Sequence, residues 1–168
     1  MRYKCEDVGL EFFDEAPSRF QASVEIAATP DQVFDAFLDA DAWVRWAWPI
    51  TRVEWTSGFP LEVGSTRTVY MRGGLIGYEE FIAYQHGVRM AFRFNVASMR
   101  DVQAFAEDYR VTDLGGGRCQ VDWTMAMKNS GGNFGFLSKL TDPVMGFMVR
   151  RMLGKFGRLV ETTKVGTK

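Results

Sequence analysis

Apolar and polar residues alternate between Phe20 and Ile26, near the beginning of the chain. A period of two is typical of a strand with one buried face. The motif that follows, TPDQ at residues 29–32, combines a favoured N-cap residue, a proline suited to the first helical position and a glutamine at the capping-box position. Apolar residues then recur at helical spacing, so we predict a short helix that ends near Asp39.

The pattern changes from helix to strand after Pro49. Before that point, a second short helical turn is predicted through Trp43 and Trp46, capped by Asp41 or a neighbour. After it, runs rich in β-branched and aromatic residues are separated by short links of Gly, Ser, Asn, Asp and Pro, which predict hairpins and hence an antiparallel meander. The predicted strands span residues 50–56, 65–71, 77–85, 88–97, 102–114 and 118–128.

The last segment returns to helical spacing, beginning at Thr141 or Asp142 before Pro143. Its apolar side consists of Met145, Met148, Val149, Met152, Phe156, Leu159, Val160 and Thr163. Together the elements predict an α+β fold, in which a curved antiparallel sheet of about seven strands packs on a long C-terminal helix, with one or two short helices after the first strand. Residues 1–18 show no clean period and are interpreted as an N-terminal arm preceding one domain at 19–164.

Composition narrows the class of protein. The chain has 168 residues and a formal net charge of −1, which gives no reason to expect binding to nucleic acid. No apolar run approaches the roughly 18 residues of a membrane span, so stable membrane insertion is not expected. The two cysteines lie far apart and are interpreted as reduced thiols of a cytoplasmic protein, and the single histidine argues against a metal site. Aromatic residues and methionine are unusually abundant, with 14 Phe, five Tyr, five Trp and nine Met.

Several of these segments resemble those of a known family. They are VEIAATPDQVF at 24–34, DAWVRW at 41–46, VGSTR at 63–67, YEE at 78–80 and GGR at 116–118 before a strand that contains Trp123. In these residues the chain is similar to the polyketide cyclase/dehydrase and lipid-transport proteins of the START-like (SRPBCC) superfamily, over roughly residues 19–164. The resemblance implies the helix-grip fold, which matches the order of elements predicted from periodicity. It also implies an internal apolar cavity, which periodicity alone does not predict. Because that superfamily contains carriers, cyclases, chaperone activators and receptors, the resemblance specifies the fold better than the function.

The candidate ligand-binding residues are those expected on the concave face of the sheet, on the facing side of the helix and, by the resemblance, near the mouth of the cavity. They are Trp43, Trp46, Trp55, Arg67, Met71, Glu80, Phe92, Phe94, Phe105, Glu107, Tyr109, Trp123, Met125, Met145, Met148 and Met152. The flexible thioether of methionine suits ligands of varied shape. The alternative is that the same side chains form a solid core.

Glu107 is the most informative single residue, because it falls on the apolar side of its strand between Phe105 and Tyr109. A carboxylate there must be paired, hydrogen-bonded or neutral, and desolvation would raise its pKa into the range of a general acid or base. The alternatives are a slip in the assumed register or a structural pair with Arg67. Arg67 and Glu80 are expected either in a polar patch beside it or on the convex face. We assign no catalytic residue, metal or cofactor.

Three functions stay open at this point. The first is a soluble binding protein for a small hydrophobic molecule such as a lipid, a polyketide-like aromatic or an isoprenoid, as a monomer or homodimer, with entry gated by loops near 58–60, 73–77 and 131–133. The second is a cyclase/dehydrase-type enzyme, which convergent polar groups in the pocket would favour. The third is a protein-interaction module, which predicts a filled core and an exposed apolar patch around Trp46, Trp48 and Phe59.

Overall fold

The computed structural model describes the backbone of residues 1–130 and 135–165 and the side chains of residues 1–130 and 143–163. Its elements are β1 (Tyr3–Lys4), α1 (Phe12–Glu15), β2 (Ser18–Ile26), α2 (Pro30–Leu38), α3 (Ala40–Trp46), β3 (Ile50–Trp55), β4 (Thr66–Met71), the 3-10 turn η1 (Arg72–Gly74), β5 (Ile76–Gln85), β6 (Arg89–Ala97), β7 (Val102–Gly115), β8 (Arg118–Asn129) and α4 (Gly135–Val165). The six strands predicted after Pro49 are confirmed to within a residue or so at each end. The expected gating loop at 131–133 lies outside the described residues.

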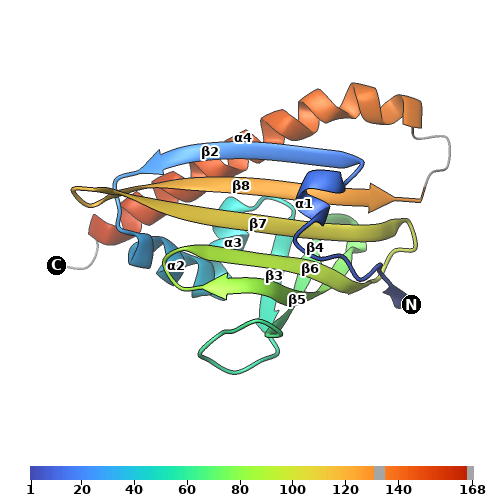
Figure 1. Ribbon diagram of the computed structural model, residues 1–168, viewed down its shortest axis with the longest axis horizontal. Helices are drawn as coiled ribbons and strands as arrows, with labels where there is room; N and C mark the ends of the chain where they lie inside the picture. Colours follow the sequence, from blue (N-terminus) through green and yellow to red (C-terminus); the bar gives the residue numbers. More distant parts are fainter. Residues whose placement is uncertain (131–134, 166–168) are drawn as a thin grey trace.

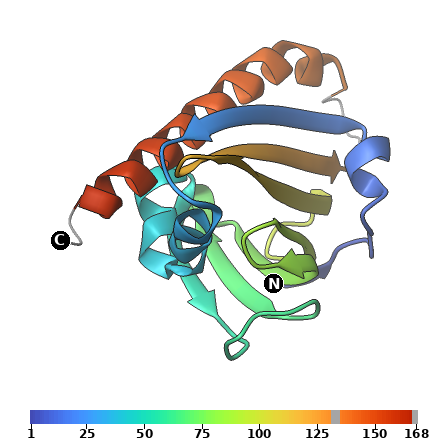
Figure 2. The ribbon, with the colours of Figure 1, turned by 60° about the vertical axis from the view of Figure 1, so that its left-hand side comes forward.

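One antiparallel sheet carries the fold. Its strands follow the order β2-β8-β7-β6-β5-β4-β3, and the short β1 adds to β6. The sheet curls into a half-barrel with α4 running across its open side (Figures 1 and 2). This is the predicted helix-grip architecture. The meander needs tight reversals, and Gly116 and Gly117 supply one between β7 and β8, with φ of +63° and +72°, values that glycine adopts without strain.

The two short helices begin as the sequence predicts. The Thr29 side chain accepts a hydrogen bond from the Gln32 backbone N–H at 3.4 Å, and the Thr29 N–H donates to Gln32 Oε1 at 3.0 Å, which completes a capping box for α2. The cap of α3 is Asp39, a neighbour of the predicted Asp41; its carboxylate accepts from the Asp41 N–H at 2.9 Å. These caps hold α2 and α3 at one end of the half-barrel.

Aromatic side chains fill that end of the half-barrel. Phe37 of α2 stacks on Phe156 of α4 with ring centroids 4.6 Å apart, and Trp46 of α3 lies 5.2 Å from the same ring. The indole N–H of Trp43 donates to the Phe37 carbonyl at 2.8 Å, which fixes α3 against α2. The helix α4 begins at Gly135, several residues before the predicted Thr141 or Asp142.

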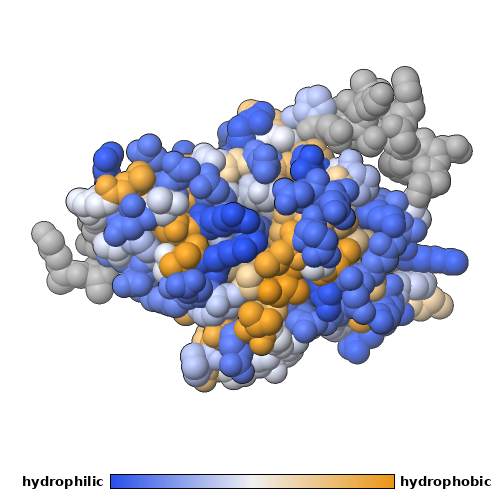
Figure 3. All heavy atoms as spheres, in the orientation of Figure 1, coloured by the Kyte–Doolittle hydropathy of each residue, from blue (hydrophilic) through white to orange (hydrophobic). Residues whose placement is uncertain are grey.

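The N-terminal residues pack on the opposite, convex face of the sheet. Helix α1 lies against β7 and β8 on the side away from α4 (Figure 1). Its Phe12 and Phe13 are buried on a floor of small residues, namely Ala91, Ala104, Ala106 and Ala126. In Figure 3, which has the orientation of Figure 1, polar side chains cover much of the surface around a central apolar strip. No helix in the described part of the chain is long and apolar enough to cross a membrane.

Candidate functional site

A cavity of about 290 Å³ lies between the concave face of the sheet, α3 and α4. Most of its wall is apolar, and its polar side chains are concentrated on β4, β5 and β7. The lining residues are Trp43, Trp46, Ala47, Pro49, Ile50, Arg67, Met71, Leu75, Glu79, Phe94, Val102, Phe105, Glu107, Tyr109, Trp123, Met125, Met127, Asn129, Met145 and Met152. The half-barrel is therefore packed solid at its α2 end and hollow toward the end where β8 finishes and α4 begins.

The structure brings most of the predicted site residues together around this cavity. Those that line it are Trp43, Trp46, Arg67, Met71, Phe94, Phe105, Glu107, Tyr109, Trp123, Met125, Met145 and Met152. The others lie elsewhere. Trp55 donates its indole N–H to the Leu38 carbonyl at 3.1 Å, Phe92 is fully buried behind the cavity wall, and Met148 is half-buried on α4 away from the lining.

Glu80 is the clearest correction, because it points to the outer face of the sheet. Its carboxylate accepts hydrogen bonds from Asn95 Nδ2 at 2.6 Å and from Arg93 Nη2 at 3.5 Å. Its neighbour Glu79 points inward instead, as alternation along a strand requires. Burial alternates without a break along this part of β5, where Gly77, Glu79 and Phe81 are buried, so Glu79 lies on the inward face and Glu80 on the outward face.

Arg67 and Glu79 form a buried ion pair in the cavity wall. They are directly opposite each other on β4 and β5, the Arg67 Nε donates to Glu79 Oε2, and their side chains are 1% and 2% exposed. The guanidinium also stacks between the rings of Trp43 and Phe92, at 4.2 and 4.3 Å from their centroids. Burial raises the pKa of Glu79, opposed by the charge and hydrogen bond of Arg67. Glu79 was not among the predicted site residues, although pairing the two adjacent strands across their short turn places it opposite Arg67.

Glu107 and Tyr109 form a second polar pair on β7. The Tyr109 hydroxyl donates to Glu107 Oε2 at 2.9 Å, and both side chains are buried. Desolvation, reinforced by the charge of Glu79, raises the pKa of Glu107 to about 8; the Tyr109 hydrogen bond, the Arg67 charge and the nearby Trp123 indole oppose the rise. Glu107 is therefore mostly protonated at neutral pH. Burial and the neighbouring Glu107 also raise the pKa of Tyr109 well above its ordinary value.

Three further donors of the cavity wall have no hydrogen-bond partner among the described residues. They are Trp46 Nε1, Arg67 Nη1 and Trp123 Nε1, and each nitrogen is shielded from solvent. The Trp123 indole comes closest to having a partner, because hydrogen bonding toward Glu107 helps to lower the pKa of that carboxyl group. The cavity thus combines an apolar wall, two satisfied polar pairs and a set of unsatisfied N–H groups.

The exposed apolar patch expected for an interaction module is only partly present. Trp46 is buried at 1% exposure, whereas Trp48 and Phe59 are each 57% exposed. The single histidine, His86, lies in the turn after β5 and is exposed, with the Tyr84 hydroxyl 3.3 Å from its Nδ1. In the described part of the chain, no group of three His, Cys, Asp or Glu side chains is placed to hold a metal.

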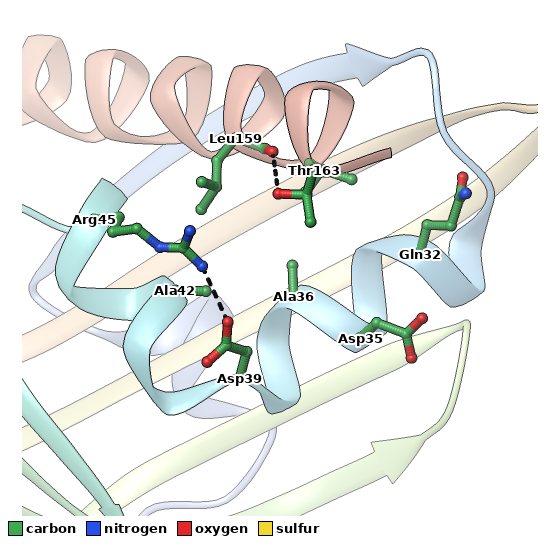
Figure 4. A pocket seen from close by; sticks show the side chains of 9 residues that line it. Gln32, Asp35, Ala36, Asp39, Ala42, Arg45, Leu159 and Thr163 are labelled. Atoms are coloured by element: carbon green, nitrogen blue, oxygen red, sulfur yellow. Dashed lines mark hydrogen bonds and ion pairs between the residues drawn. The ribbon is translucent and has the colours of Figure 1, made fainter. Parts of the chain in front are cut away.

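A second hollow lies on the surface between α2, α3 and α4 and differs in character from the cavity (Figure 4). Asp35, Asp39 and Arg45 line it together with small and apolar residues, and Asp39 accepts from Arg45 Nη2 at 3.0 Å. None of the predicted site residues contributes to it. Its acid–base pair is exposed, so the pair adds little stability and no unusual chemistry.

Comparisons with known proteins agree with this architecture. A START superfamily protein from Mycobacterium smegmatis superposes with a TM-score of 0.70 at 9% identity, over 86% of this chain and 98% of that one. The Zhui aromatase/cyclase from Streptomyces sp. R1128 superposes with a TM-score of 0.63 at 15% identity, over 87% of this chain and 92% of that one. At these identities the similarity shows the shared fold.

Sequence comparison extends the relationship beyond the fold. An uncharacterized protein of Mycobacterium tuberculosis strain H37Rv is 54% identical over 129 residues, which are 77% of each chain. Residues 17–161 match the family described as polyketide cyclase/dehydrase and lipid transport. That match covers strands β2 to β8, helices α2 and α3 and most of α4, including the residues that line the cavity. The chain therefore belongs to the polyketide cyclase/dehydrase and lipid-transport family.

Proposed function

We propose that this protein binds a small hydrophobic molecule in the cavity between the sheet and α4. The observation that carries the proposal is the cavity itself, about 290 Å³ in volume and walled mainly by apolar side chains. This volume is near the lower end of the usual range for small-molecule pockets. Burial of ligand carbon would drive binding at about 25 cal/mol per Å² before ordering costs.

The methionines of the wall favour a ligand whose shape is not tightly prescribed. Met71 and Met125 line the cavity from the sheet, and Met145 and Met152 line it from α4. Their unbranched thioether side chains repack more easily than branched or aromatic ones. The hollow interior also argues against the interaction module, for which a filled core is expected.

A second candidate, an acid–base enzyme of the cyclase/dehydrase kind, is favoured by one specific observation. The Arg67–Glu79 and Glu107–Tyr109 pairs both line the cavity, so its polar groups converge. A carboxyl group with a pKa near 8 is protonated at neutral pH, yet close enough to its pKa to exchange a proton with a bound molecule. Glu107 would be the general acid or base, and Tyr109 would hold its carboxyl group in place.

Native mass spectrometry of the protein purified from its own host, followed by solvent extraction, tests both candidates. A retained apolar compound is expected, and titration with the neutral fluorescent probe N-phenyl-1-naphthylamine should then show saturable uptake. The variant Met125→Trp fills the cavity and should weaken uptake by about tenfold or more, because an overfilled pocket loses the buried contact area. Met99→Trp makes the same change at a side chain that is 39% exposed and should bind as wild type does.

Two results together would overturn the binding proposal. The protein would carry no bound compound in native mass spectrometry, and Met125→Trp, shown by circular dichroism to be folded, would take up the probe as well as wild type does. Incubation of wild type and of Glu107→Gln with the extracted compound distinguishes the enzyme from the binding protein. Retained binding with loss of a mass change seen for wild type would support acid–base chemistry. If neither protein changed the mass of the compound, the enzyme candidate would be rejected and the binding function would stand.

A further inference from the structure

The hairpin formed by β6 and β7 does not stay paired along its whole length. Its ladder ends at Arg93 and Ala106, although both strands continue beyond that pair. There β1 takes the place of β7 beside β6. On the other side, the Glu6 N–H donates to the Gln103 carbonyl of β7 at 2.8 Å. Residues 3–6 are therefore hydrogen-bonded to both strands and lie between them.

This inserted segment closes the sheet beside the cavity. Cys5 is 3% exposed and packs with Phe94, Val102 and Phe105, and its thiol donates to the Val102 carbonyl at 3.6 Å. Those three partners all line the cavity. Because neighbouring strands lie about 4.8 Å apart, an inserted strand holds β6 and β7 about 10 Å apart at this level. Cys5 thus covers, from outside, an interruption in the cavity wall.

Residues 1–8, which we call the strap, are held by few contacts besides these backbone hydrogen bonds. Glu6 pairs with Lys128 Nζ at 2.8 Å, and both side chains are more than 40% exposed. Asp7, itself exposed, lies 3.5 Å from Arg93 Nη2. Such exposed ion pairs stabilise a structure only slightly. Cys5 is the one strap residue that is buried. Terminal segments with so few buried contacts open at a low free energy.

The chain that follows the strap is anchored separately. The Val8 carbonyl accepts from Arg93 Nη1 at 2.9 Å. Beyond it, α1 buries Phe12 and Phe13 on the alanine floor of the convex face. These rings hold α1 on the sheet whether or not residues 1–8 are paired with β6. The strap can therefore detach and return while it stays tethered next to its place.

We propose, building on the binding function above, that the strap is a gate, and that its release opens a side entrance to the cavity between β6 and β7. The sheet need not unfold, because the β6–β7 ladder from Arg89 to Arg93 stays paired. The rings of Phe94 and Phe105, 4.5 Å apart between centroids, are then the remaining barrier. The strap precedes residues 17–161, so the gate lies outside the part of the chain that defines the family.

A disulfide that fastens the strap tests the gate. Lys4 and Val96 are directly opposite each other on β1 and β6, a separation that a disulfide can span. In Lys4→Cys/Val96→Cys, peptide mapping must show the bond between positions 4 and 96, since Cys5 is adjacent. Oxidation should slow uptake and release of N-phenyl-1-naphthylamine in stopped-flow fluorescence by about tenfold or more. The dissociation constant should stay unchanged, and reduction should restore the rates.

A second disulfide is the matched control. Gln21 and Thr124 are directly opposite each other on β2 and β8, strands that do not border the opening. Gln21→Cys/Thr124→Cys should exchange the probe at the same rates when oxidised and when reduced. Equal rates in the oxidised and reduced forms of Lys4→Cys/Val96→Cys would overturn the gate and leave the binding function intact. Uptake that the filled cavity of Met125→Trp leaves unchanged would count against the binding function itself.

Native-state hydrogen exchange tests the opening of the strap without any substitution. The amides of Cys5 and Glu6 donate to the carbonyls of Asn95 and Gln103. They should exchange at least about tenfold faster than the hydrogen-bonded amides of the β6–β7 ladder, because the strap opens while the ladder stays intact. Equal protection of the two sets would mean that the strap is released only when the sheet unfolds, and the gate would be rejected.

Discussion

At the scale of single residues, the buried acids of the cavity wall have different partners and therefore different consequences. Glu79 contacts the guanidinium of Arg67, so its charge is compensated. Glu107 accepts a hydrogen bond from the Tyr109 hydroxyl, which brings no compensating charge, and the charge of Glu79 disfavours its ionisation. Alternation along β7 predicts that Glu107 faces inward, and the structure agrees. Of the alternatives considered for Glu107, the structural pair with Arg67 is not formed, because Arg67 pairs with Glu79 of the neighbouring strand β5.

Glu107→Gln tests the protonation of this residue through its effect on stability. Between the ordinary carboxyl pKa and about 8, the unfolded chain releases a proton that the folded protein keeps, so the free energy of unfolding of the wild type falls as pH rises. The slope reaches at most about 1.4 kcal/mol per pH unit. Glutamine has no proton to lose, so the variant should resemble wild type at pH 5 and become increasingly more stable than it toward pH 9.

Urea denaturation of both proteins at pH 5, 7 and 9 measures this difference. Glu79→Gln is the matched control, because it leaves the Arg67 charge buried without its partner and should destabilise the protein by roughly 3–5 kcal/mol at pH 7. A constant difference between Glu107→Gln and wild type from pH 5 to pH 9 would show that Glu107 does not hold a proton in the folded state.

At the scale of elements, the close approach of β5 and β6 shapes the cavity wall. Gly77 lies near the start of β5, where a Cβ atom would overlap the ring of Phe94 on β6. The absence of a side chain at Gly77 lets that ring pack 4.5 Å from Phe105, centroid to centroid, and both rings line the cavity. A glycine inside a strand often marks such close packing.

Gly77→Ala should therefore affect stability and binding together. The added methyl group forces the Phe94 ring to move, at a cost of about 1–3 kcal/mol for overpacking. A displaced Phe94 changes the cavity wall, so uptake of N-phenyl-1-naphthylamine should weaken as well. Gly58→Ala is the control, since a Cβ there meets nothing within 4 Å, and its stability should stay within about 0.5 kcal/mol of wild type. A fully stable Gly77→Ala with unchanged uptake would contradict this packing argument.

The elements themselves were largely predictable from the sequence, because their signals are local. Period-two alternation and glycine-marked turns identify the strands of the meander, and the TPDQ motif identifies the start of α2. The positions that were not predicted depend on neighbouring strands. Alternation continues through Glu79 and Glu80, so the choice of the inward acid depends on which face of β5 packs against the core, and the neighbouring elements decide that. The start of α4 at Gly135 is similarly absent from the local pattern, since it lies before Pro143.

At the scale of the whole molecule, the cavity depends on the separation between the sheet and α4. Hydrophobic periodicity identifies which side chains face that space but not the width of the space. Near α2 the gap is closed by the stacked rings of Phe37 and Phe156. Farther along, the lining comes from α3, from strands β3 to β8 and from α4, so the site exists only when all of these elements are assembled.

Binding in such a site should stabilise the entire fold, because the unfolded chain has no cavity to bind a ligand. A compound present at 100 times its dissociation constant should add about 2.7 kcal/mol to the free energy of unfolding. Thermal unfolding with increasing N-phenyl-1-naphthylamine should therefore show a midpoint that rises with concentration in wild type and in Met99→Trp, and little change in Met125→Trp, where the cavity is filled. If the midpoints of all three proteins rose equally, the probe would be binding outside the cavity, and the expected coupling between ligand binding and the assembly of sheet and helix would be wrong.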